Sequence, residues 1–122
     1  MTKMEELRIQ QMMRLGCCAC AYLDIVYVAQ ECHHILYGNR RMGDWFTIPL
    51  CRGHHQLDFT AEQREVLTPK QLVGIASGRK AFARVYPTER ELWERTQERL
   101  GLTWPTPKAV EKIQFFSPSD AV

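Results

Sequence analysis

The segment Ile48-Pro49-Leu50-Cys51-Arg52-Gly53-His54-His55 places a cysteine three residues before a pair of histidines. The chain has 122 residues and 4 histidines, and the other two histidines form a second adjacent pair, His33-His34. Upstream lies a Cys-x-x-Cys motif formed by Cys17 and Cys20. So few histidines would seldom fall into pairs flanked by cysteines by chance, and this spacing indicates metal binding.

The cysteines and histidines divide into two sets. One is a Cys3His set, the ligand chemistry of structural zinc, and it consists of Cys17, Cys20, Cys51 and His54. Three histidines remain outside it, with positions open for chemistry: His33, His34 and His55. Two alternatives stay open, namely buried thiols that hold no metal and an exchange of His54 with His55 between the sets. Cys18 and Cys32 are expected to be bystanders.

The composition is that of one small domain. We expect it to span residues 1–103, with a helix over 4–15, a metal-binding core over 17–60, a helical part over 61–101 and a tail over 104–122. A zinc ion would compensate for the small hydrophobic core. The formal net charge of +2 neither requires nor excludes a nucleic-acid partner.

Cysteines in metal-ligand spacing are typical of a reducing cytosol rather than of a disulfide framework. No apolar run approaches the roughly 20 residues that cross a membrane, and the start Met1-Thr2-Lys3-Met4 is not typical of a signal peptide. We therefore expect a cytoplasmic protein with no membrane partner.

The pattern of residues within the core predicts two strands followed by a helix. The β-branched and aromatic run 25–29 predicts a strand that leads into Glu31-Cys32-His33-His34. A glycine-punctuated polar loop is expected over 37–44, and a second strand over 45–50. A helix should then begin near Cys51–Gly53 and carry both following histidines in its first turn.

Capping residues predict the helices on either side of this core. Gly16 is placed to end the first helix, and Thr68 and Ser77 resemble helix N-caps. A capping box begins at Thr88, and Gly101 is placed to end the last helix. In that helix three side chains should pack inward, Leu92, Trp93 and Leu100. A mixed-charge, solvated face should lie between them, formed by Glu94, Arg95, Glu98 and Arg99.

The residues 31–36 and 43–55, taken together, resemble the HNH, or ββα-metal, fold. More narrowly, they resemble the bacteriophage recombination-enhancement nucleases that act with RecA, and the stretch 78–86 is also similar to that family. The resemblance covers about residues 15–100. It implies an α+β fold in which a small zinc-stabilised ββα-metal core is flanked by helices.

The resemblance also implies a role for each histidine of the second set. His33 would bind a catalytic divalent metal, His34 would act as the general base, and His55 would be the second protein ligand. Two imidazole ligands would accept Mg²⁺ or Mn²⁺, and also Zn²⁺. The asparagine that gives HNH its middle letter would fall near Phe46 or Thr47, neither of which can fully replace it. Asn39 is expected in the loop between the strands, so Thr47 or a backbone carbonyl is left to orient His34.

The function implied is metal-dependent hydrolysis of phosphodiester bonds in DNA by an endonuclease. Arg40, Arg41 and Arg52 flank the implied catalytic loop and could hold phosphates, although solvated arginines would look the same in sequence. The implied partners are DNA and a RecA filament on single-stranded DNA, in phage recombination or repair within a bacterial host. The alternative is a noncatalytic zinc module that binds DNA or a protein. Trp93 and Trp104 are expected in a core or an interface.

Overall fold

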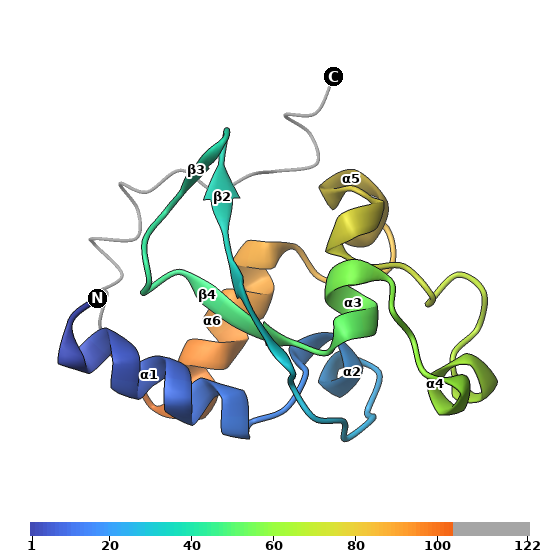
Figure 1. Cartoon of the computed structure of the whole chain (residues 1–122), viewed down its shortest axis with the longest axis horizontal. Coiled ribbons are helices and arrows are strands. Elements are labelled where there is room, and N and C mark those ends of the chain that lie inside the picture. The colour runs from blue at the N-terminus through green and yellow to red at the C-terminus, as the bar shows by residue number, and fades with distance from the viewer. Residues whose placement is uncertain (104–122) are drawn as a thin grey trace.

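The computed structural model describes residues 1–103. Its elements follow the chain in this order: α1 (Lys3–Arg14), α2 (Cys18–Tyr22), β1 (Glu31–His34), β2 (Leu36–Tyr37), β3 (Arg40–Arg41), β4 (Thr47–Leu50), α3 (Arg52–Gln56), α4 (Ala61–Val66), the 3-10 helix η1 (Ile75–Ser77), α5 (Arg79–Ala83) and α6 (Glu89–Leu100). The α1 and α6 helices pack beside the β1–β4 pair, and α3 follows β4 (Figure 1). The α+β class expected from sequence is confirmed. The expected tail, with Trp104, lies outside the described residues.

The first helix begins and ends as its sequence predicts. The hydroxyl of Thr2 accepts a hydrogen bond from the backbone N–H of Glu5, and the Glu5 carboxylate accepts one from the backbone N–H of Thr2. After α1, Gly16 has a positive φ of 87°. A Cβ at this position would lie 2.6 Å from the carbonyl oxygen of Tyr27, so only glycine fits. The chain therefore turns sharply into the first cysteines.

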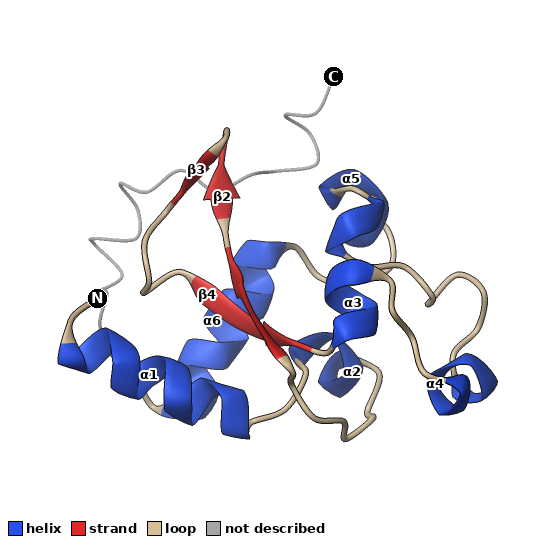
Figure 2. Ribbon diagram, in the orientation of Figure 1, coloured by secondary structure: helices blue, strands red, loops and turns tan. Residues whose placement is uncertain are grey.

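The β1 and β4 strands form an antiparallel pair in which His33 lies opposite Ile48 and His34 opposite Thr47. The sequence predicts a loop between these strands, over residues 37–44, but part of the connection is not a loop. It forms the β2–β3 hairpin, which projects from the end of β1 (Figure 2). The turn consists of Gly38 and Asn39, and Gly38 has the positive φ of 64° that such turns require.

The expected strand over 25–29 is wrong, since the strand begins only at Glu31. The segment instead wraps around α2. The backbone N–H of Ile25 donates to the carbonyl of Cys20, and the carbonyl of Tyr27 accepts from the N–H of Cys17. Val26 and Val28 are 101% and 64% exposed. Local hydrogen bonds to the Cys-x-x-Cys turn override the β propensity of these side chains.

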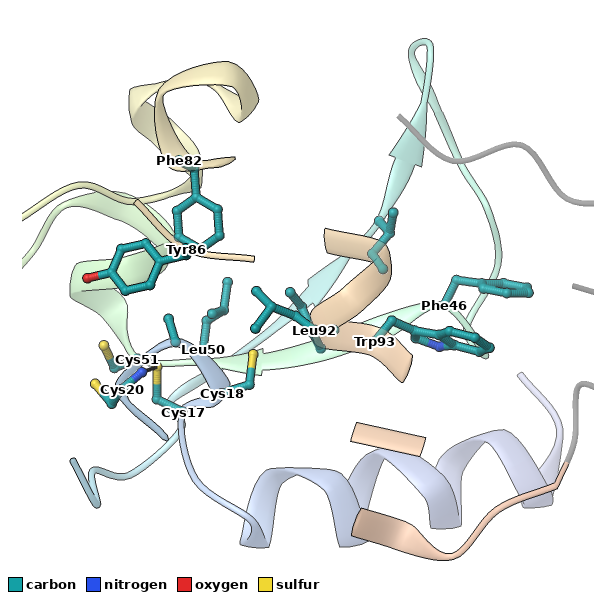
Figure 3. Close-up of a cluster of buried hydrophobic side chains, with 13 residues drawn as sticks. Cys17, Cys18, Cys20, Phe46, Leu50, Cys51, Phe82, Tyr86, Leu92 and Trp93 are labelled. Atoms are coloured by element: carbon teal, nitrogen blue, oxygen red, sulfur yellow. Dashed lines mark hydrogen bonds between the residues drawn. The ribbon is translucent and has the colours of Figure 1, made fainter. Parts of the chain in front are cut away.

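The core lies between the β1–β4 pair and α6, and it continues to the cysteines (Figure 3). The Phe46 and Trp93 rings stack at 5.2 Å, and the Phe82 and Tyr86 rings stack at 4.8 Å. Leu92 and Trp93 are buried as predicted, whereas Leu100 is only half-buried. The expected charged face of α6 is exposed.

The helical part departs from its prediction at two caps. Thr68 opens a single turn rather than a helix, and Ser77 belongs to η1, where its hydroxyl accepts from the N–H of Gly74. Gly78 precedes α5 without any side-chain cap. Thr88 caps α6 by accepting from the backbone N–H of Glu91, but the expected capping box does not form, because the Glu91 carboxylate accepts from the Thr88 hydroxyl instead of from its backbone N–H. Gly101 ends the helix in the left-handed conformation, as expected. No helix within residues 1–103 has the length and apolar character needed to span a membrane.

Candidate metal centres

The structure brings together the four residues of the Cys3His set. Nδ1 of His54 lies 3.3, 3.4 and 3.6 Å from the sulfurs of Cys51, Cys20 and Cys17. All four candidate ligand atoms lie within 4.8 Å of one another, and all four residues are buried. Nitrogen and sulfur ligands of a tetrahedral zinc are about 3.6 Å apart. The set could therefore hold a zinc ion, and His54, not His55, faces the thiols.

Two short helices present these sulfurs. Cys17 is the N-cap of α2 and accepts from the N–H of Cys20, and Cys51 is the N-cap of α3 and accepts from the N–H of His54, both at 3.4 Å. The Gln63 amide adds a third N–H, 3.3 Å from the Cys51 sulfur. N–H donors directed at sulfur favour the thiolate, which is the form that binds metal.

Hydrogen bonds and burial shift the pKa values of the clustered thiols in opposite directions. Side-chain hydrogen bonds from Cys17 and Cys20 lower the pKa of Cys51 well below its usual range. A side-chain hydrogen bond with Cys20 lowers the pKa of Cys17. A hydrogen bond with Cys51 and burial raise it by more, so the pKa of Cys17 rises to about 11. Burial raises the pKa of Cys18, which stays a neutral thiol outside the set, as expected of a bystander.

Tyr86 fixes the orientation of His54. Its hydroxyl lies 2.6 Å from Nε2 of His54 and donates to the carbonyl oxygen of Gln71, also at 2.6 Å. A hydroxyl that donates to the carbonyl must accept from the imidazole, so Nε2 carries the proton and Nδ1 is left to face the sulfurs. Burial raises the pKa of Tyr86, which keeps its phenol protonated. The sequence singled out the stretch around Tyr86 but not this contact.

The second set holds a pair of facing imidazoles. Nδ1 of His33, on β1, lies 3.2 Å from Nε2 of His55, on α3. The other nitrogen of each ring contacts a carboxylate. His33 Nε2 lies 3.1 Å from Glu89, and His55 Nδ1 lies 2.8 Å from Glu31.

These contacts decide which nitrogens can bind a cation. A neutral imidazole has one N–H, and in both rings a carboxylate is placed to accept it. The facing nitrogens then both present lone pairs, which repel unless a cation or a proton lies between them. Two nitrogens bound at adjacent positions of one metal are about 3.0–3.4 Å apart, so the donor set fits a divalent ion.

The two supporting carboxylates are themselves held. Glu89, at the start of α6, is 6% exposed and forms an ion pair with Arg79 of α5 at 3.0 Å. Glu31 accepts a hydrogen bond from the Gln56 amide at 3.0 Å. The sequence reasoning missed both acids. Glu31 precedes His33 by two residues, which is a weak signal, whereas Glu89 looked only like part of a helix cap.

His34 belongs to a different contact. Its Nε2 lies 3.0 Å from a carboxylate oxygen of Asp44, in the turn before β4. With Nε2–H directed to Asp44, Nδ1 is left with the lone pair. Asp44 is therefore the residue that contacts the His34 ring, where the sequence offered only Thr47 or a backbone carbonyl. The Thr47 hydroxyl instead donates to the backbone oxygen of Asp44, at 3.2 Å.

The three arginines expected to touch DNA are all exposed. Arg40 and Arg41 form β3, in the hairpin that leaves the end of β1 (Figure 1). Arg52 begins α3, and its backbone N–H donates to the side chain of Gln30. All three thus lie in or beside the elements that carry the second histidine set.

Comparison with known proteins identifies the family. No curated protein matches the chain. A family model described as "Recombination enhancement, RecA-dependent nuclease" matches residues 1–101, which include every element of the structure. The chain therefore belongs to the recombination-enhancement, RecA-dependent nuclease family.

Proposed function

We propose that the chain is a metal-dependent DNA endonuclease of the HNH type. The observation that carries this proposal is the pair of facing nitrogens of His33 and His55, 3.2 Å apart, each ring held from behind by a carboxylate. A purely structural zinc module has no need of such a pair beside its zinc site. Membership of a nuclease family supports the same conclusion.

In this proposal His33 and His55 hold a divalent ion, Mg²⁺, Mn²⁺ or Zn²⁺. Such an ion would offset negative charge on the phosphate under attack and on the departing 3′ oxygen. Glu89 and Glu31 keep the two rings in the tautomers that leave Nδ1 of His33 and Nε2 of His55 available.

His34 takes the proton of the attacking water. Asp44 holds Nε2–H, so Nδ1 accepts the proton as the water oxygen bonds to phosphorus and the bond to the 3′ oxygen breaks. A histidine suits this step because its unperturbed pKa, about 6.5, lies near working pH. Asp44 then stabilises the imidazolium that forms.

The Cys3His set would hold a structural zinc that fixes α3 and hence His55. The exposed Arg40, Arg41 and Arg52 would contact phosphates, which positions DNA without reading its sequence. The family description supports a RecA filament on single-stranded DNA as partner. We place the activity in phage recombination or repair, in the cytoplasm of a bacterial host.

The test is nicking of supercoiled plasmid by the zinc-loaded protein, with and without added Mg²⁺ or Mn²⁺. With zinc limited to one ion per chain, in the Cys3His set, we expect cleavage only with added metal, and a loss of about 10²- to 10⁴-fold in rate for His34→Ala. Zinc content should not change in that variant. Cys32→Ala, next to the same histidine pair, is the matched control. A His34→Ala rate equal to wild type would remove His34 from the mechanism, and no cleavage under any condition would favour a noncatalytic zinc module.

A further inference from the structure

Arg8 of α1 is a buried cation with neutral partners. Its side chain is 2% exposed, although most arginines lie at the surface. Nε donates to the Gln97 amide oxygen at 2.7 Å, and Nη1 contacts the Met12 sulfur at 3.4 Å. Burial lowers the pKa of this guanidinium to about 10. Within residues 1–103 no ion pair to Arg8 compensates for its desolvation, so the charge is costly to keep there.

The guanidinium grips one residue of the central strand pair. Nη1 donates to the hydroxyl of Thr47 at 2.7 Å, and Nη2 donates to the backbone oxygen of Thr47 at 3.1 Å. Thr47 is fully buried and lies directly opposite His34 in the β1–β4 register. Two donors in a rigid fork fix both the side chain and the backbone of Thr47.

The Thr47 hydroxyl connects Arg8 to Asp44. The hydroxyl accepts from Arg8, and it donates its single proton to the backbone oxygen of Asp44 at 3.2 Å. The Met12 sulfur, at 3.7 Å, is the weaker competing acceptor. The Asp44 carboxylate in turn lies 3.0 Å from Nε2 of His34. Three consecutive contacts thus join a helix at the start of the chain to the proposed base.

We propose that Arg8 is a positioning residue for His34, acting through Thr47 and Asp44. It sets where the Asp44 carboxylate stands and therefore the tautomer and orientation of the His34 ring. This inference rests on the proposed function, because it assigns a second group to the same reaction. It also explains why a cation is buried where an apolar side chain would pack at less cost.

The experiment compares Arg8→Met and Thr47→Val with the conservative Thr47→Ser. Arg14→Met, on the exposed face of the same helix, is the matched control. Plasmid nicking gives kcat and KM at saturating metal, and zinc content and thermal unfolding report on the fold. Displacing the base should lower kcat about 10- to 100-fold in Arg8→Met and Thr47→Val, with KM and zinc content unchanged. Thr47→Ser keeps the hydroxyl and should retain near wild-type kcat.

A double-mutant cycle separates positioning from general stability. If Arg8 acts through Asp44, adding Arg8→Met to Asp44→Asn should cost little beyond Asp44→Asn alone. Nitrogen-15 correlation spectra of the His34 ring give a readout that needs no catalysis. The ring should hold one tautomer in the wild type and lose it in Arg8→Met.

Several outcomes would overturn the proposal. These are wild-type kcat in folded Arg8→Met or Thr47→Val, independent effects in the cycle, or an unchanged His34 spectrum. If Arg8→Met does not fold, the Thr47→Val and Thr47→Ser pair decides alone. His34→Ala runs in parallel. A wild-type rate in that variant sinks the proposed mechanism, whereas a loss there with no loss in Arg8→Met sinks only the positioning role.

Discussion

Nδ1 of His33 and Nε2 of His55 face each other at 3.2 Å, although 22 positions separate the two residues in the chain. The strand register creates this approach. His33 pairs with Ile48 near the start of β4, and α3 begins as soon as β4 has ended, at Arg52. The helix then carries its second histidine back toward β1. A strand pair and one helix are enough to build the candidate centre.

Removing the zinc should unfold the core rather than only weaken activity. Cys17 and Cys20 precede β1, while Cys51 and His54 follow β4, so the site joins the segment that enters β1 to the helix that follows β4, at one end of the antiparallel strand pair. We expect about one zinc per chain, and loss of zinc and of helical circular dichroism in Cys20→Ala. Cys32→Ala, outside the set, should keep its zinc. A folded wild-type protein without zinc would contradict this site.

Tyr86→Phe should loosen the zinc without unfolding the protein. The substitution removes the hydroxyl that accepts from Nε2–H of His54, so the ring is no longer held in one tautomer. Loss of such a partner costs about 10- to 100-fold in metal affinity, which competition with a chromogenic chelator can measure. Tyr22→Phe is the control, since that ring contacts Tyr86 but is 42% exposed. Equal zinc affinity in both variants would show that the contact between Tyr86 and His54 does not contribute to zinc binding.

Glu89→Gln should raise the metal concentration needed for cleavage. Its carboxylate supports His33 and pairs with Arg79, and a neutral amide would hold the ring less firmly. We expect a shift of about 10- to 100-fold in half-saturating Mn²⁺, with the rate recovered at excess metal. Glu94→Gln, on the exposed face of the same helix, should need the same Mn²⁺ concentration for half-maximal cleavage as the wild type. A loss in Glu89→Gln that no metal concentration restores would contradict a supporting role.

The hairpin arginines should contribute to DNA binding through charge alone. If Arg40 and Arg41 each neutralise one phosphate, then Arg40→Ala or Arg41→Ala should reduce the slope of log K against log salt concentration by about 0.9. Binding should weaken similarly on unrelated sequences. Arg64→Ala, on the exposed surface of α4, is the control. Unchanged slopes in both hairpin variants would leave these arginines as solvated surface residues.

RecA bound to single-stranded DNA should stimulate cleavage. With a formal net charge of +2 and a proposed site held by only two protein ligands, the chain on its own should bind DNA modestly and with steep salt dependence. Nicking of plasmid by the protein alone should therefore be slow, and a filament paired with its target should accelerate it. Equal rates with and without the filament, across a range of salt, would remove RecA from the proposal.

The sequence predicted best what local spacing determines. The Cys-x-x-Cys turn, the Cys-x-x-His turn and the two histidine pairs each lie within a few residues, so their spacing carries the ligand geometry. The strand ending in His34 and the caps at Thr88 and Gly101 followed from short patterns in the same way. At 25–29 a short pattern failed, because the hydrogen-bonding needs of α2 override side-chain propensity.

The supporting residues could not be predicted because they come from distant parts of the chain. Glu89 is 56 positions from the histidine it holds, and Tyr86 is 32 positions from His54. Arg8 is 39 positions from Thr47. Nothing in the neighbourhood of an acid, a tyrosine or an arginine records which ring or strand it will meet, since that is decided by how α1, α5 and α6 pack.

Tyr86 and Glu89 stand three residues apart, just before and at the first turn of α6, yet one supports the histidine of the thiol cluster and the other supports His33. A fragment ending near residue 60 would keep every candidate ligand but would lose Tyr86 and Glu89, the two residues that support these histidines. A design that transfers this centre to another scaffold would have to include the chain through the start of α6, because the functional unit contains more than the metal ligands.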